Sequence, residues 1–139
     1  MTKNRLLTTA NRAFKKGKFD ISESLYRKLL KIAPKEPIAN YRVALLLEKR
    51  AQFSQCTNYF KIALENSPTN GNYWVAYISA LLSNGEIEKV EAVLSIATKH
   101  RVPLKYLNNS YNLLQEIKNT ILAMKPKQLA QYLKFGKYE

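Results

Sequence analysis

The chain has 139 residues, 46% of them hydrophobic, so it is long enough to bury one core and too apolar to be intrinsically disordered. Its 4 glycines and 5 prolines are too few for the many tight turns of an all-β protein, so the composition favours helices. The 23 basic and 10 acidic side chains give a net charge of +13, which permits nucleic acid, anionic lipid or an acidic protein as partner without choosing among them.

The single cysteine, Cys56, excludes an internal disulfide and a cysteine-based zinc site. One unpaired thiol also favours a reducing compartment, so we expect a cytoplasmic protein. No apolar run approaches the roughly 18 residues that a membrane-spanning helix needs. The sequence therefore predicts a helical protein without a transmembrane segment.

The first predicted unit, residues 3–36, consists of two helices with a sharp turn between them. Gly17 suits the left-handed conformation that ends a helix, so it marks the turn. Asp20 is a good N-cap and makes a capping-box-like pair with Glu23, so we expect the second helix to open there. Pro34 ends that helix, because the residue before a proline resists the helical region.

These features recur at a step of about 34 residues, which predicts two further units, 37–70 and 71–104. The recurring positions are Gly17, Ala51 and Gly85 for the turn; Asp20, Ser54 and Glu88 for the expected N-cap; Tyr26, Phe60 and Leu94 for a large apolar residue; and Pro34, Pro68 and, one position late, Pro103 for the closing proline. So many coincident positions indicate one helix–turn–helix unit, repeated three times.

Small residues at the helix contacts, Gly-x-aromatic at the turn and a closing proline make this pattern resemble the tetratricopeptide repeats, over about residues 3–104. The resemblance implies an all-α fold, a right-handed superhelical solenoid of antiparallel helix pairs. We expect Ala44 to be buried against the second helix of its own unit. The third unit keeps Trp74 at the aromatic position near its start, but it departs with Ile78 and Val90 where the family prefers small residues. We therefore expect its helix pair to be slightly splayed.

The C-terminal part is predicted as a capping helix, residues 105–125, followed by residues 126–139 as the first helix of a further, truncated repeat. A stacked array exposes an apolar face at its end, which such a helix could cover. Gly136, Lys137 and Tyr138 repeat the Gly-Lys-Phe of the first turn, so we expect the chain to be a piece of a longer protein. The alternative is that this segment folds back as the natural end cap.

An enzyme needs convergent polar groups, and few candidates are present. His100, the only histidine, lies near a helix end, which favours a surface residue over a general base. Cys56 falls at a predicted helix–helix contact, which favours a buried small residue over a nucleophile. We therefore expect no enzymatic activity and no cofactor or metal within these residues.

The family resemblance implies that the first helices of the units line a concave groove that binds a peptide or extended protein segment. For Phe14, Tyr41 and Leu45, packing between repeats is an equally good interpretation. The predicted groove residues are Asn11, Phe14, Lys15, Tyr41, Leu45, Glu48, Lys49, Asn72, Val75, Ser79 and Leu82.

One use of the family is to clamp a C-terminal carboxylate with lysines, arginines and asparagines at fixed places. Only Asn11 matches that clamp. The other places hold Leu7, Arg42, Asn72 and Ala76, so the clamp is largely absent and we reject that function.

Basic residues cluster at the first turn, where Arg12, Lys15, Lys16 and Lys18 form a predicted basic patch. Nucleic-acid binding needs such charge, but single-strand binders add exposed aromatic residues, and the aromatic residues here occupy core-type positions. An acidic protein partner is therefore the better hypothesis.

We predict a protein–protein interaction module, serving as a scaffold or assembly part of a longer chain. One alternative is a basic module that binds nucleic acid or an acidic membrane surface. Another is the regulatory repeat segment of a larger transferase, because residues 72–97 resemble bacterial proteins in which such repeats precede a transferase domain. Self-association through the exposed end of the array is a further expectation.

Overall fold

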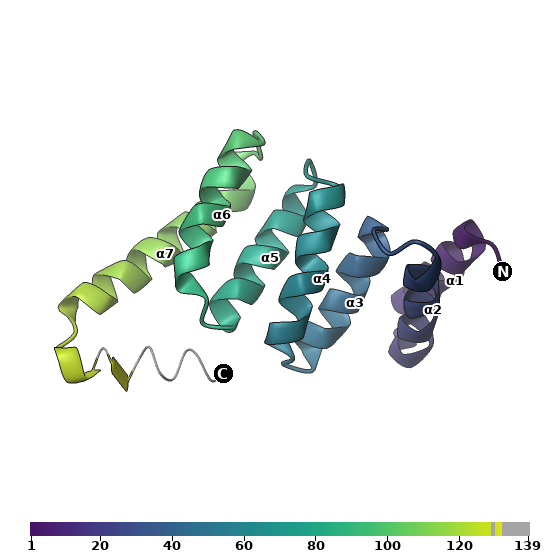
Figure 1. Cartoon of the computed structure of the whole chain (residues 1–139), viewed down its shortest axis with the longest axis horizontal. Helices are drawn as coiled ribbons and strands as arrows, with labels where there is room; N and C mark the ends of the chain where they lie inside the picture. Colours follow the sequence, from purple (N-terminus) through teal and green to yellow (C-terminus); the bar gives the residue numbers. More distant parts are fainter. Residues whose placement is uncertain (129, 132–139) are drawn as a thin grey trace. The chain divides into compact units, whose positions relative to one another are not determined.

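The computed structural model describes residues 1–128 and 130–131, and their regular secondary structure is entirely helical (Figure 1). They divide into two compact units, Met1–Ser67 and a second unit from Pro68 onward. The first unit contains α1 (Lys3–Lys15), α2 (Phe19–Ile32), α3 (Pro37–Lys49) and α4 (Phe53–Asn66). The second contains α5 (Gly71–Ser83), α6 (Ile87–Lys99) and α7 (Leu104–Ala123). The prediction of an all-α fold built from helix pairs is confirmed.

The helices follow the repeat period that the sequence indicates. α1, α3 and α5 begin at residues 3, 37 and 71, and α2, α4 and α6 begin at residues 19, 53 and 87. Pro34 and Pro68 lie just beyond α2 and α4, as expected of residues that cannot continue a helix. The division into domains that we derived from the sequence stays a prediction, although the helices repeat in phase with it.

Each helix pair is joined by a turn in which one residue adopts a left-handed backbone. That residue is Gly17 (φ 76°), Ala51 (φ 57°) or Gly85 (φ 75°). At Ala51 the N–H of Gln52 donates to the carbonyl of Leu47, and the N–H of Ala51 donates to the carbonyl of Glu48. These two bonds form the Schellman motif, which satisfies the last carbonyls of a helix.

The expected N-caps are wrong, because the second helices open earlier in the chain. Asp20, Ser54 and Glu88 each lie at the second helical residue, and the capping residues are Lys18, Gln52 and Glu86, none of which makes a side-chain capping bond. The residue that completes each Schellman motif is also the N-cap of the next helix. The turn is therefore too short to leave room for a separate cap.

The core of the first unit depends on small residues where the paired helices cross. Ala10 and Ala44 are completely buried, as expected of Ala44 in particular. Ser22 and Cys56, which hold the same position in successive repeats, are also completely buried. Their side chains hydrogen-bond carbonyls of the preceding helical turn, the Ser22 hydroxyl at 3.0 Å and the Cys56 thiol at 3.4 Å. These compact side chains let the two helices of each pair approach closely.

The second unit is packed less tightly at the corresponding crossing. Ile78 and Val90 replace the small residues there, both are fully buried, and α5 and α6 lie less close together than the pairs of the first unit. α7 compensates by packing on α5, where the ring of Tyr106 lies directly over Gly71. A side chain at residue 71 would collide with that ring. The smaller contact between α5 and α6 agrees with the expected splaying of the third helix pair.

Two different side chains anchor the start of successive repeats to the preceding proline. The buried Asn40 donates its amide to the carbonyls of Pro34 (3.0 Å) and Glu36 (2.8 Å). Trp74, at the equivalent place in the next repeat, donates its indole N–H to the carbonyl of Pro68 at 2.7 Å. These bonds tie the first turn of α3 and of α5 to the prolines that follow α2 and α4.

α7 begins at Leu104 and buries Leu107, Ser110 and Leu114. Beyond it, residues 126–128 and 130–131 are helical. The predicted half-repeat includes Gly136, Lys137 and Tyr138, which lie outside the described residues, so that hypothesis stays a prediction.

Enlarging the side chain at the helix crossing tests the close packing of the first unit. We expect Ala44→Leu to lower the free energy of unfolding by about 1–3 kcal/mol, because its methylenes have no space between α3 and α4. Urea denaturation measures the effect. The matched control is Asn58→Leu, which adds a leucine at an exposed position of α4 and should change stability little. Equal stability of Ala44→Leu and the wild type would contradict the close crossing.

Replacing the left-handed alanine tests the turn. We expect Ala51→Gly to raise the free energy of unfolding by about 0.5–1 kcal/mol, because glycine adopts positive φ without the steric cost that alanine meets. Ala33→Gly is the control, because Ala33 has a φ of −133° and does not need the positive φ that glycine favours. This substitution should only lower the stability of the protein, because glycine gives the unfolded chain more freedom. Thermal and urea unfolding of the three proteins measure the sign, and a loss of stability in Ala51→Gly would refute the argument.

Candidate functional site

The predicted groove residues belong to both units. Asn11, Phe14 and Lys15 lie on α1 and Tyr41, Leu45, Glu48 and Lys49 on α3, all in the first unit, whereas Asn72, Val75, Ser79 and Leu82 lie on α5 in the second. All eleven side chains are at least partly exposed. We call the α1 and α3 residues of this set, together with Arg42, the α1–α3 face.

Cations lie over aromatic rings on the α1–α3 face. The guanidinium carbon of Arg42 is 4.3 Å from the ring centroid of Phe14 and 5.9 Å from that of Tyr41. Phe14 also packs edge-on against Phe19 of α2, with ring centroids 5.4 Å apart. The Lys49 ammonium lies 3.9 Å from the Phe19 centroid. Positive charge attracted to ring faces in this way holds side chains of α1, α2 and α3 in one cluster.

The aromatic residues of this face are packed on one side and exposed on the other. Tyr41 lies 5.7 Å, centroid to centroid, from the fully buried Phe60 of α4. Phe14 is likewise held against Phe19, yet Phe14 and Tyr41 both remain only half-buried. Each ring therefore supports the fold with one side and leaves apolar surface open on the other.

Arg42 is the residue of this face that the sequence did not single out as a groove residue. Its Nε atom is buried and, within the described part of the chain, has no hydrogen-bond partner. A buried donor without an acceptor is costly, and more so when the group carries a charge. The corresponding positions of the first and third repeats hold Thr8 and Ala76. An arginine found at this position in only one of the three repeats was the feature of the sequence that could have indicated a role for Arg42.

The Tyr26 hydroxyl links the core of the first repeat to the α1–α3 face. It donates a hydrogen bond to the Asn11 side-chain oxygen at 2.5 Å. Burial raises the pKa of Tyr26 to about 12, so the hydroxyl keeps its proton and remains a donor at neutral pH. Asn11 is thereby oriented, with its side-chain oxygen engaged and its amide N–H groups directed elsewhere.

Burial also affects the titrating groups near α3. It raises the pKa of the Glu48 carboxyl and of the Tyr41 hydroxyl. The Cys56 thiol has its pKa raised to about 11, first by burial and then by the Glu48 charge. A thiol that stays protonated and fully buried is a poor nucleophile, so the interpretation of Cys56 as a small core residue is confirmed.

An ion-pair cluster holds α3 beside α2 and so fixes the second half of the α1–α3 face. Glu23 of α2 contacts Arg27 at 2.9 Å and Arg50, at the end of α3, at 2.7 Å. Arg27 also donates to the Tyr59 hydroxyl of α4 at 3.2 Å. Burial alone would raise the pKa of Glu23, but the hydrogen bonds and charges of Arg27 and Arg50 hold it below its usual 4.5.

The remaining residues singled out from the sequence are at the surface. His100 is exposed at the C-cap of α6, where its ring lies 5.7 Å from that of Trp74, as expected of a surface histidine. The basic residues Arg12, Lys15, Lys16 and Lys18 are all exposed. Within the described residues, no cluster of three or more His, Cys, Asp and Glu side chains could hold a metal ion. In the same part of the chain no helix is long and apolar enough to cross a membrane.

Solved structures resemble the chain in fold, and three of them are described next. The Sgt2 TPR domain from Aspergillus fumigatus has a TM-score of 0.69 at 15% identity, over 89% of this chain and 84% of that one. The first TPR of Spaghetti (RPAP3), bound to the HSP90 peptide SRMEEVD, has a TM-score of 0.65 at 17% identity, over 87% and 94%. The TPR2B domain of yeast Sti1, in a complex with pHsp70, has a TM-score of 0.60 at 17% identity, over 82% and 90%. The chain thus has the tetratricopeptide-repeat fold.

No protein-family pattern and no curated protein matches the sequence. The likeness is therefore one of fold, at identities too low to carry a binding partner from those proteins to this chain. The predicted loss of the carboxylate clamp, with Leu7, Arg42, Asn72 and Ala76 at its other places, stays a prediction.

Acidification tests the ion-pair cluster. Because the folded pKa of Glu23 lies below its unfolded value, its stabilisation is present above about pH 4.5 and is lost as the pH falls through the folded pKa. We expect Glu23→Gln to lower the free energy of unfolding by about 1 kcal/mol at pH 7, since both arginines are partly solvated. The difference from the wild type should shrink on acidification.

Urea unfolding across this pH range measures the effect. The matched control is Glu65→Gln, whose carboxylate lies 4.0 Å from Lys61 with both side chains more than half exposed, and which should change stability little at any pH. A pH-independent loss in Glu23→Gln would show that packing, rather than charge, is what the residue contributes.

Proposed function

We propose that the chain is a protein-interaction module whose α1–α3 face binds an extended peptide with an acidic side chain. Arg42 would receive the carboxylate, and the half-buried rings of Phe14 and Tyr41 would receive the apolar residues beside it. The observation that carries the proposal is the partly exposed Arg42, whose guanidinium carbon lies 4.3 Å from the ring centroid of Phe14.

A peptide carboxylate would bind the accessible N–H groups of this guanidinium. Arginine presents its N–H groups as a planar fork that matches two carboxylate oxygens, and such charge-assisted bonds are the strong ones. The guanidinium is already placed by the rings of Phe14 and Tyr41, at 4.3 and 5.9 Å. A cation held in place before binding loses less conformational entropy when the ligand arrives.

The aromatic residues support affinity rather than charge recognition. Phe14 and Tyr41 are held by Phe19 and Phe60 respectively, so both rings are pre-positioned and partly exposed. Rigid aromatic anchors of this kind dominate the energetics of many interfaces. Leu45, half-buried one turn after Tyr41, extends the apolar part of the surface.

We extend the proposal to the second unit, where Asn72, Val75, Ser79 and Leu82 of α5 would contact the same class of ligand. Excess basic charge in the first 50 positions, with 13 Lys and Arg against 4 acids, would speed the approach of an acidic partner. The HSP90 peptide named for the RPAP3 structure and the pHsp70 complex named for the Sti1 structure support protein or peptide binding as a use of this fold. A cytoplasmic scaffold or assembly role within a longer chain, without catalysis, is the wider hypothesis.

Selection from a degenerate peptide library tests the proposal. We expect the immobilised wild-type chain to enrich peptides that combine an acidic residue with apolar ones. Arg42→Gln should weaken the enriched peptide by roughly ten- to a hundredfold, the loss expected of one charge-assisted hydrogen-bond pair. Isothermal titration with the synthetic peptide measures this.

Lys31→Gln is the matched control, because it removes one positive charge from an exposed site on α2 of the same unit. It should bind the peptide as the wild type does. An enriched set without acidic residues, or equal losses in Arg42→Gln and Lys31→Gln, would reject the proposed role of Arg42.

A further inference from the structure

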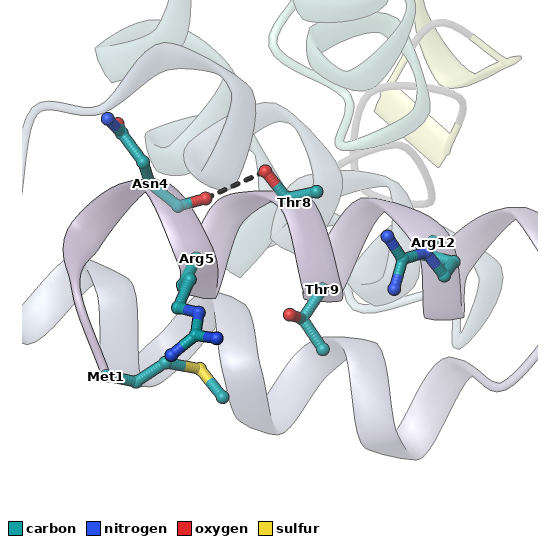
Figure 2. Close-up of a pocket in the computed structure, with 6 residues that line it drawn as sticks. All are labelled: Met1, Asn4, Arg5, Thr8, Thr9 and Arg12. Atoms are coloured by element: carbon teal, nitrogen blue, oxygen red, sulfur yellow. Dashed lines mark hydrogen bonds between the residues drawn. The ribbon is translucent and has the colours of Figure 1, made fainter.

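An open depression lies along the side of α1 in the first unit (Figure 2). Apart from Met1, the residues that line it are polar or basic, and none of them belongs to the α1–α3 face. The lining residues are Met1, Asn4, Arg5, Thr8, Thr9 and Arg12.

Two guanidinium groups dominate this depression. Arg5 and Arg12 are exposed, and among the described residues neither side chain forms an ion pair or a hydrogen bond. Thr8 donates its hydroxyl to the Asn4 carbonyl at 2.8 Å, whereas the Thr9 hydroxyl makes no such bond within that part of the chain (Figure 2). The depression therefore presents two unpaired cations with a free hydroxyl between them.

The charge continues along the same side of the helix. Arg5, Arg12 and Lys16 are spaced i, i+7 and i+11, a spacing that aligns side chains on one face. Seven helical steps separate the two arginines by about 10 Å at their Cα atoms, within reach of a group contacted by both long side chains. No acidic residue precedes Asp20 in the sequence, so no carboxylate on α1 neutralises this face.

We propose that this depression binds a phosphomonoester, carried on a phosphoserine or phosphothreonine of a protein partner. A phosphate carries nearly two negative charges and three strong acceptor oxygens at neutral pH. It can therefore satisfy Arg5, Arg12 and the Thr9 hydroxyl together. A carboxylate, with one charge and two oxygens, matches this donor set less well.

The lining argues against other anionic macromolecules. No aromatic side chain is among the described residues that line the depression, so they offer no stacking platform for single-stranded nucleic acid. Met1 is the one large apolar residue of this lining, so there is little to insert into a membrane beside the charges. A phosphate on a peptide therefore matches the two arginines and the threonine hydroxyl of this lining best.

The two arginines of this site lie on a different side of α1 from the Phe14 ring. Helical periodicity places Arg5 and Arg12 nearly opposite Phe14 on α1. The phosphate proposal therefore does not rest on the proposed function, and the two sites can be tested with different substitutions.

The experiment uses amide NMR and fluorescence anisotropy on the full chain. The probe is a short Gly/Ser peptide carrying one phosphoserine, compared with the same peptide carrying serine, at about 150 mM salt. We expect the phosphopeptide to bind at least tenfold more tightly, and to shift the amide signals of α1 residues 4–12. Arg5→Gln and Arg12→Gln should each weaken binding by about tenfold, the loss of one charge-assisted contact.

Two controls separate this site from the rest of the surface. Lys31→Gln and Lys28→Gln each remove the same charge from an exposed site on α2; both should bind the phosphopeptide as the wild type does. Equal binding of the phosphorylated and unphosphorylated peptides, equal losses in Lys31→Gln, or shifts away from α1 would overturn the proposal. Tighter binding of phosphatidylserine vesicles or of a short oligothymidylate through Arg5 and Arg12 would also overturn it, and would assign the depression to membrane or nucleic acid.

Discussion

The short turn between paired helices is the constraint on which each helix pair depends. Only a residue at positive φ lets the chain reverse there, and Gly17, Ala51 and Gly85 supply it. Because the turn is short, the two helices lie side by side immediately after it. The side chains at their crossing must therefore be small, or the helices must lie further apart. Ala44 and Cys56 meet the first condition in α3 and α4, and Ile78 and Val90 produce the second outcome in α5 and α6.

The candidate binding surface follows from this arrangement of helices. Once α2 packs between α1 and α3 through its aromatic residues and the Glu23 cluster, the outer sides of α1 and α3 share a surface. Arg42 and Lys49 then lie over the rings of Phe14 and Phe19. Their positive charge is positioned by the packing of the rings, which makes the surface a better candidate for recognition than the charge of the chain alone would suggest. The two arginines of the basic depression lie opposite Phe14 on α1, and its described lining holds no aromatic ring.

The successes and failures of the sequence predictions have identifiable causes. The repeat period, the turns and the closing prolines were correct because each depends on local backbone conformation. The N-caps were wrong because Asp20 and Ser54 have high capping preference, yet the turn is so short that Lys18 and Gln52 must serve as caps. Arg42 was left out of the groove because its importance comes from Phe14, on a different helix far earlier in the chain, and no local pattern encodes that contact.

The sequence by itself determined the helical class, the length of the repeating unit, the position of each turn and the small residues of the first two crossings. It could do so because helical periodicity is a local pattern, and because glycine and proline affect the backbone conformation of only a few neighbouring residues. The tertiary structure alone decided which nitrogen of Arg42 is buried without a partner among the described residues, and which carboxylate joins α2 to α3. It also decided which arginines of α1 remain unpaired within that part of the chain. Those properties arise when side chains from distant parts of the chain meet, and their energies depend on burial and distance, which a linear sequence does not contain.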